Sequence, residues 1–222
     1  MFDRRPAGVD SASAPSTDHS RWAGLRTLKL IHDLNERCLK ALTDRAQEDR
    51  PSEGPGILRL HRDEWHALEG PLHAATVAHF PFLLLDVRFD DDRWWHAISM
   101  AESETVRPCP TAGFFPSGIA TTLMRETLML AWHTVQLNRG AAMILLGASA
   151  PVCACIASLR LPDIERLSVE CHTEIAPRWA HLTEFWRPFL RAVRTGDFEF
   201  LYDLHLHGFQ LLGRGFTSPT RS

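Results

Sequence analysis

The apolar residues between Trp22 and Ala46 recur every three or four positions, and this spacing constrains the fold more than any other feature of the sequence. An α-helix has about 3.6 residues per turn, so such spacing places the apolar side chains on one face. The residues of that face are Leu25, Leu28, Ile31, Leu34, Cys38, Leu39 and Leu42. The sequence predicts an amphipathic helix over 22–46, ending before the Pro- and Gly-containing segment 47–56.

Helical patterns continue along most of the chain. One or two short helices are predicted over 60–79, with a break near Gly70-Pro71, and another short helix ends near Met100. Further helices are predicted over 120–138, with a bend at Arg139-Gly140 and a further turn that runs to Leu146, and over 151–158, 163–171, 180–193 and 198–212. Only 81–92 has a strand-like pattern. The predicted fold class is therefore all-α, mainly helical, with at most one short strand near 82–89.

Glycine, serine and proline mark the predicted helix ends in the second half of the chain. Gly147 is expected to follow a helix in the left-handed conformation, which glycine adopts without a steric penalty. Ser149 is a candidate N-cap, and Pro151 and Pro162 suit the first turns of the two following helices.

Composition shifts divide the sequence into two predicted units. Residues 1–20 contain few large apolar side chains and are predicted to form a disordered tail. Segment 103–118 carries three prolines and two glycines, so it is predicted to link a unit at 21–102 to a second at 119–212, with a polar tail at 213–222.

Charge and cysteine content bear on location and partners. The formal net charge is −3, whereas an autonomous nucleic-acid-binding protein usually has a basic domain or stripe. Five irregularly spaced cysteines without a signal peptide predict free thiols in a reducing compartment. No stretch reaches the ~18 apolar residues of a membrane span, so a cytoplasmic protein with no membrane association is expected.

The sequence contains no motif of a known enzyme class. It has no Gly-x-Ser-x-Gly elbow, no P-loop and no dinucleotide-binding glycine fingerprint, so an enzyme is not expected, and no cofactor is implied. Cys153, Cys155, Cys171 and His172 are candidate zinc ligands. Residues two apart on a helix point in different directions, however, so buried apolar cysteines are the favoured interpretation and no metal site is predicted.

Two further groups have a structural and a functional interpretation. Asp86, Asp90, Asp91 and Asp92 lack the glycine and distal glutamate of a calcium loop, so a solvated turn is favoured over a cation site. His205 and His207 could bind metal or stack on a partner, but a surface or core role is favoured.

Aromatic and basic residues in the second half provide the candidate binding surface. Most of the seven tryptophans are expected in the core, although aromatic residues also anchor interfaces. Arginines at the start of and along the predicted helix 180–193 could form a basic face for a protein partner or DNA. The candidate partner- or DNA-binding residues are Arg178, Trp179, Arg187, Arg191 and Arg194.

The segment Met143–Leu167 resembles the core of the flagellar transcriptional activator subunit FlhD. The shared features are a helix ending in Met-x-x-Leu-Gly, a short helix, Ala-x-Leu-x-Leu-Pro and a further helix, and the match needs no gap. The matching residues include Met143, Leu146, Gly147, Ala157, Leu159, Leu161, Pro162 and Leu167. Each of them is a helix end or a core position, so the pattern marks a fold and no chemistry. Leu145 stands where the family often has arginine, which puts the family's partner and DNA contacts in doubt.

The first half resembles other parts of the same family. Segment 31–42, with Asp33 and Asn35, resembles the start of the first helix, and 87–90 resembles the Phe-Arg-Phe-Asp stretch. Arg88-Phe89 and Arg178-Trp179 lie 90 residues apart, as expected of a diverged tandem duplication.

The resemblance implies a function as well as a fold. FlhD forms a helical homodimer and joins the zinc-containing subunit FlhC to activate flagellar promoters, so two fused units could form an intramolecular pseudo-dimer. A monomer of this kind or a homo-oligomer is expected. The expected function is regulation of motility genes through an FlhC-like partner that supplies most of the DNA affinity. The alternative is a scaffold of a motility or secretion system that retains only the fold.

Overall fold

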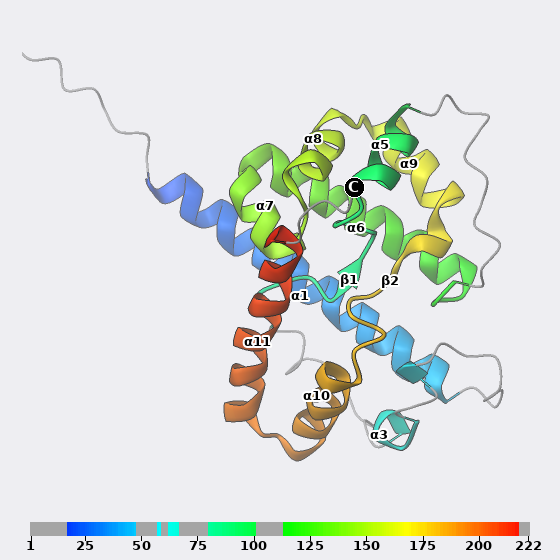
Figure 1. The fold of residues 1–222 in the computed structure, drawn as a ribbon, viewed down its shortest axis with the longest axis vertical. Coiled ribbons are helices and arrows are strands. Elements are labelled where there is room, and N and C mark those ends of the chain that lie inside the picture. The colour runs from blue at the N-terminus through cyan, green and yellow to red at the C-terminus, as the bar shows by residue number, and fades with distance from the viewer. Residues whose placement is uncertain (1–16, 48–56, 59–61, 67–79, 101–112, 218–222) are drawn as a thin grey trace, which may run out of the picture.

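A computed structural model describes residues 17–47, 57–58, 62–66, 80–100 and 113–217. These residues form helices around one short antiparallel ribbon of two strands (Figure 1). The all-α class predicted from the sequence is therefore confirmed. The predicted break at Gly70-Pro71 and residues 103–112 of the predicted linker lie outside the described residues. The rest of that linker, 113–118, is described, and its Ser117 and Gly118 form the first turn of a helix.

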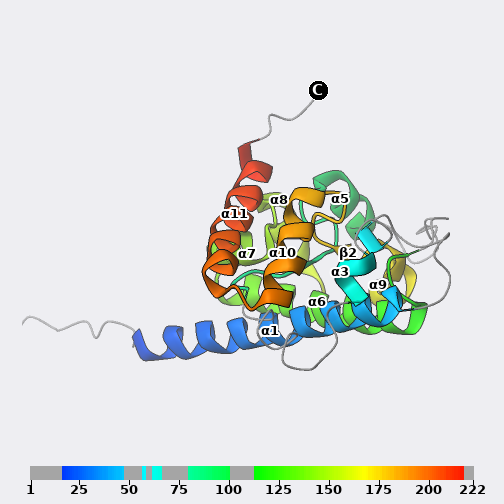
Figure 2. The ribbon, with the colours of Figure 1, turned by 90° about the horizontal axis from the view of Figure 1, so that it is seen from below.

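Two long helices, α1 (Thr17–Ala46) and α6 (Ser117–Leu137), pack against each other. In Figures 1 and 2, α1 runs along one side of the molecule, and its first turns project beyond the body. The predicted C-terminal end at Ala46 is confirmed, whereas the start at Thr17 lies inside the predicted tail. Leu25, predicted on the buried face, is 56% exposed.

Asn35 fastens α1 to the segment before the ribbon. Its side chain is fully buried, donates a hydrogen bond to the Phe82 carbonyl at 3.0 Å, and accepts one from the Leu84 amide at 2.7 Å. A buried amide that is satisfied on both sides fixes two segments in register.

The ribbon joins the two halves of the chain. Strand β1 (Leu85–Asp86) pairs antiparallel with β2 (Ala176–Pro177), with Leu85 opposite Pro177 and Asp86 opposite Ala176. The predicted limit of one short strand near 82–89 is therefore wrong. A two-residue strand such as β2 is too short for a period-two pattern to reveal it.

The shorter helices follow the predicted boundary signals closely. Helix α7 (Arg139–Leu146) ends at Gly147, which has φ 62°, and α8 (Ala150–Ser158) begins after Ser149, whose hydroxyl accepts the Val152 amide. Helix α9 (Leu161–Glu170) has Pro162 in its first turn, as predicted, and a 3-10 turn (His172–Glu174) follows.

The remaining helices flank the ribbon. Helix α3 (Arg62–His66) packs against α10 (Thr183–Thr195), and α5 (Asp92–Met100) packs against α8. Helix α11 (Phe198–Thr217) lies beside α10 and α7 at one side of the molecule (Figure 1). Helix α10 begins three residues later than predicted, because Trp179 and Ala180 belong to the turn after β2.

Several of the described elements share a spacing of 91 residues. This spacing separates the first residues of β1 and β2, the first residues of α5 and α10, and the last residues of α1 and α6. It also separates Trp95 from Trp186, and each indole donates to the carbonyl eight residues before it. The expected spacing of 90 is therefore one residue short, and Arg88 corresponds to Trp179.

Both predicted units contribute to one hydrophobic cluster, which extends from Ile31 in α1 to Leu212 in α11. The antiparallel ribbon pairs Leu85 with Pro177 and Asp86 with Ala176, so within the ribbon a local twofold axis exchanges residues that lie 91 apart. The described parts of the two halves share one core.

Replacing Asn35 with alanine should lower the free energy of unfolding by about 3 kcal/mol, because two buried backbone groups lose their partner. Urea unfolding followed by circular dichroism would measure the change. Glu36→Ala, at the exposed neighbouring position, is the control and should change stability by less than about 0.5 kcal/mol. Equal effects of the two substitutions would contradict this role of Asn35.

Candidate functional site

The buried guanidinium of Arg178 is the centre of the candidate site. Nε donates to the Leu83 carbonyl at 2.9 Å, and Nη2 donates to the carbonyls of Leu85 at 3.2 Å and Leu146 at 2.6 Å. Leu146 is the last residue of α7, so a cation also complements the negative end of that helix. Arg178 therefore holds the first half of the chain, the ribbon and α7 together.

Burial and charge act on Arg178 in opposite directions. Desolvation lowers the pKa of the guanidinium, and the carboxylates of Asp86 and Asp90 raise it again. The Nη2 atom of Arg178 lies 3.6 Å from an oxygen of Asp86. Paired with Asp86 and bonded to three carbonyls, the buried charge is compensated as a stable buried ion requires.

Gly147 makes room for this guanidinium. Its φ of 62° is in the left-handed region, and a Cβ atom here would lie 2.6 Å from both Nη1 of Arg178 and a methyl carbon of Leu212. Glycine is thus required by the backbone and by the close approach of Arg178.

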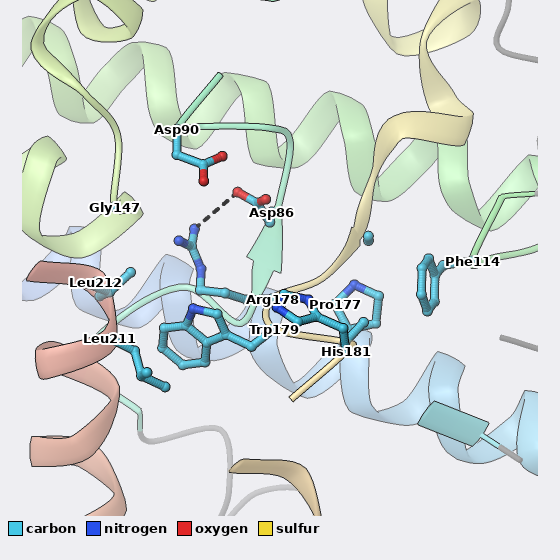
Figure 3. Close-up of a pocket in the computed structure, with 12 residues that line it drawn as sticks. Asp86, Asp90, Phe114, Gly147, Pro177, Arg178, Trp179, His181, Leu211 and Leu212 are labelled. Carbon is cyan, nitrogen blue, oxygen red and sulfur yellow. Dashed lines mark ion pairs between the residues drawn. The ribbon is translucent and has the colours of Figure 1, made fainter. Parts of the chain in front are cut away.

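A pocket of about 480 Å³ opens beside Arg178 (Figure 3). Two carboxylates, one guanidinium, one imidazole, one indole and several apolar side chains line it. The residues are Asp86, Asp90, Phe114, Gly147, Ala176, Pro177, Arg178, Trp179, Ala180, His181, Leu211 and Leu212. This combination of apolar walls and a few converging polar groups is typical of small-molecule sites.

Trp179 adopts a strained backbone conformation at the pocket wall. Its φ is 53°, a region that bulky residues rarely occupy. The turn is held because the Trp179 carbonyl accepts the Leu182 amide at 2.7 Å, and because its ring packs edge-on against Phe82 and Phe185. Strain of this kind clusters at functional sites.

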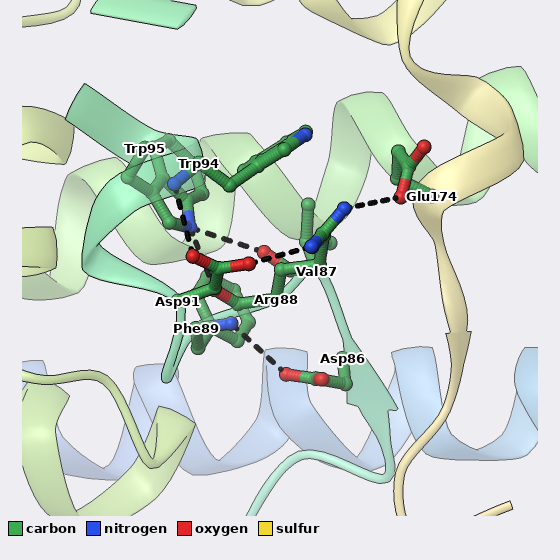
Figure 4. A network of polar contacts seen from close by, with 8 residues as sticks. All are labelled: Asp86, Val87, Arg88, Phe89, Asp91, Trp94, Trp95 and Glu174. Atoms are coloured by element: carbon green, nitrogen blue, oxygen red, sulfur yellow. Dashed lines mark hydrogen bonds and ion pairs between the residues drawn. The ribbon is translucent and has the colours of Figure 1, made fainter. Parts of the chain in front are cut away.

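Arg88 occupies the corresponding turn in the first half and has a different role (Figure 4). Its guanidinium contacts Asp91 at 2.6 Å and Glu174 at 3.4 Å, so it ties α5 to the segment before β2. Partial burial alone would raise the pKa of Asp91, but hydrogen bonds from the Trp94 amide and from Arg88 outweigh it and hold that pKa below its usual value. This network therefore has a structural role, since it holds α5 against the segment before β2.

The acidic group at 86–92 does not converge on one point. Asp86 lies beside Arg178, Asp91 caps α5, and Asp92 accepts a hydrogen bond from Ser149. Within the described ranges, no three His, Cys, Asp or Glu side chains are arranged to hold a metal ion.

The predicted arginine face divides into buried and exposed members. The structure corrects Arg178, which is 6% exposed and bonded internally, and Trp179 is half-buried at the pocket. Arg187, Arg191 and Arg194 are exposed on α10. Nε of Arg187 lies 3.2 Å from Glu64 and Nε of Arg191 lies 4.0 Å from it, whereas Arg194 has no ion-pair partner among the described residues.

The other candidate residues lie apart. His205 packs edge-on against Phe80 with ring centroids 4.2 Å apart, and burial followed by the nearby His32 lowers its pKa. The Nε2 atom of His172 and the hydroxyl of Ser117 share a hydrogen bond of 3.1 Å. Of the thiols proposed as zinc ligands, Cys153 and Cys171 are buried and Cys155 is half-buried.

Sequence reasoning singled out Gly147 and Asp86 but did not join them to a pocket with Leu211 and Leu212. The left-handed glycine after α7 was a local signal, whereas the convergence of these residues depends on distant segments.

No family model matches the chain, and searches of curated proteins and of solved structures find no match to it. No single described helix is both long and apolar enough to cross a membrane. One bent pair, α7 with α8, passes the same length and composition test only when the two are taken together.

Arg178→Lys should lower the free energy of unfolding by about 3–5 kcal/mol, because an ammonium cannot bond the three carbonyls in the geometry of the guanidinium fork. Arg187→Lys, on the exposed face, should cost less than about 1 kcal/mol. Denaturant unfolding of both variants measures the difference. A loss of stability at Arg178 no larger than that at Arg187 would contradict the role of Arg178 in connecting the three segments.

Thiol labelling tests the cysteine environments. Burial raises the pKa of Cys171 to about 11 and raises the pKa values of Cys38 and Cys153, so these thiols carry little thiolate at pH 8. In a Cys109→Ser background, the native protein should react rapidly with a disulfide reagent at Cys155 and slowly at the other three thiols. Rapid reaction of all four without unfolding would contradict this burial.

Proposed function

We propose that the protein is a regulator of the FlhD type, which acts through helical surfaces on a protein partner that supplies most of the DNA affinity. The observation that carries the proposal is the arrangement of Met143–Leu167. Leu146, Gly147 and Pro162 lie at the helix ends and starts that the FlhD resemblance requires. The 91-residue repeat and its pseudo-twofold ribbon also fit a chain that combines two such units.

The partner surface differs from that of the family. Ile144 is 55% exposed at the end of α7, and Leu145, in place of the frequent arginine, is half-buried against the core. Apolar residues at positions 144 and 145 favour a protein contact over a phosphate contact, since phosphates are bound by basic side chains.

The exposed arginines of α10 support a role for charge in partner binding. Arg187, Arg191 and Arg194 recur at helical spacing on one face, and Glu64 neutralises part of their charge. With a net charge of −3, the chain has too little positive charge to hold DNA strongly by itself. A basic partner such as an FlhC-like subunit would supply the remainder.

Affinity purification of the tagged chain from its own cells, followed by mass spectrometry, is the first test of the proposal. Co-elution of an FlhC-like subunit with promoter DNA supports a regulator. Recovery of motility or secretion components alone would favour the scaffold and count against it.

The double substitution Arg191→Glu/Arg194→Glu should weaken binding of the recovered partner about tenfold or more, because it reverses two exposed charges on one face. Titration calorimetry at two salt concentrations would measure this loss. The double substitution Arg26→Glu/Arg93→Glu reverses two exposed charges on α1 and α5 and is the matched control. Equal effects of the two variants would show that overall charge, and not the α10 face, determines binding.

A further inference from the structure

A small-molecule regulator would need a sizeable apolar pocket with convergent polar groups, and the pocket beside Arg178 has these properties. Its volume of about 480 Å³ lies within the range of roughly 300–1,000 Å³ that is usual for ligand sites. The groups that line it come from the turn after β1, from β2, from the end of α7 and from α11.

The charge of the pocket is negative. Asp86 and Asp90 contribute two carboxylates, and Arg178 contributes one positive charge. The Nε and Nη2 groups of Arg178 donate hydrogen bonds to three backbone carbonyls. The distance of 3.6 Å between Nη2 and the nearest Asp86 oxygen is longer than a hydrogen bond. Asp90 is exposed and accepts no hydrogen bond from a described residue. The two carboxylates carry two negative charges and Arg178 carries one positive charge, so one negative charge remains to attract a ligand.

The remaining walls favour an apolar body next to that charge. Trp179 presents a half-buried indole, and Phe114, Leu211 and Leu212 add apolar surface. Figure 3 shows the two carboxylates on one side of Arg178 and the indole of Trp179 on the other. The guanidinium carbon of Arg178 already lies over the Trp179 ring, 6.0 Å from its centroid, so the indole contributes apolar surface and the two carboxylates select the charge of the ligand.

We propose that this pocket binds an organic cation, with an ammonium or guanidinium group at Asp86 and Asp90 and an apolar body along Trp179 and Leu211. The strained turn at Trp179 fits this role, because it places the indole at the pocket wall. Neither the FlhD resemblance nor a partner is needed for the assignment, so it stands or fails separately from the proposed regulatory function.

Ligand binding would join α11 to the ribbon. Leu211 and Leu212 belong to α11, whereas Asp86 ends β1 and Asp90 lies in the turn after it, more than 100 residues earlier in the chain. A ligand that binds only the folded state stabilises it by RT ln(1 + L/Kd), where L is the free ligand concentration, so the stability of the contact between α11 and the ribbon would rise with ligand concentration.

The test uses the full-length protein and three probes of similar shape. Titration calorimetry should detect 2-phenylethylammonium but neither 2-phenylethanol nor 3-phenylpropionate, and the melting temperature should rise only with the cation. N-acetylarginine amide is the fourth probe. Tighter binding of the free amine indicates a small metabolite, and tighter binding of the arginine derivative indicates a partner's side chain, so either result supports the cation site.

Two variants test whether the carboxylate charges of the pocket determine ligand binding. Asp90→Asn should weaken binding of the cation about fivefold, and the double variant Asp86→Asn/Asp90→Asn should abolish it and allow 3-phenylpropionate to bind beside Arg178. Asp203→Asn removes an exposed carboxylate from α11 outside the pocket and should leave binding unchanged. Circular dichroism would confirm that each variant folds.

Three results would overturn the assignment. The first is that neither cation binds at millimolar concentration. The second is that the neutral alcohol binds as tightly as the ammonium probe, and the third is that Asp90→Asn leaves cation binding unchanged. A failure to recover any protein partner would leave these measurements unaffected, so the two proposals are separable.

Discussion

The guanidinium of Arg178 joins segments that lie far apart in the sequence, and the arrangement around the ribbon depends on it. It bonds the carbonyls of Leu83 and Leu85 before and within β1, and that of Leu146 at the end of α7. None of these carbonyls can be satisfied by water in a buried position, so removal of the arginine would leave several polar groups unpaired at once. The required glycine at position 147 follows from the space that this side chain occupies, and the same side chain lines the pocket.

Local features of the fold could be predicted because their causes are local. Gly147 ends α7, Ser149 caps α8 and Pro162 starts α9 through interactions within one or two turns of each residue. The end of α1 at Ala46 was likewise visible in the apolar periodicity and the polar segment that follows it.

The site could not be predicted in the same way because it depends on long-range contacts. An arginine beside a tryptophan at the start of a predicted helix looks like an exposed basic face, and the sequence does not show that Leu83 and Leu146 surround Arg178. Strand β2 has only two residues, and its pairing with β1 is determined by the packing of the two halves. The acidic residues at 86 and 90 were visible as a group, but their position across a pocket from Leu211 was not.

The pseudo-twofold ribbon has an evolutionary consequence. In a symmetric homodimer, every substitution near the axis appears twice, so a residue that benefits one side is imposed on the other. Here the 91-residue spacing aligns Asp86 with Pro177 and Asp90 with His181, and both pairs lie around the same pocket. Because the two paired segments belong to one chain, each can mutate alone, so Asp86 and Asp90 on one side can face Pro177 and His181 on the other, a difference that a homodimer could not maintain.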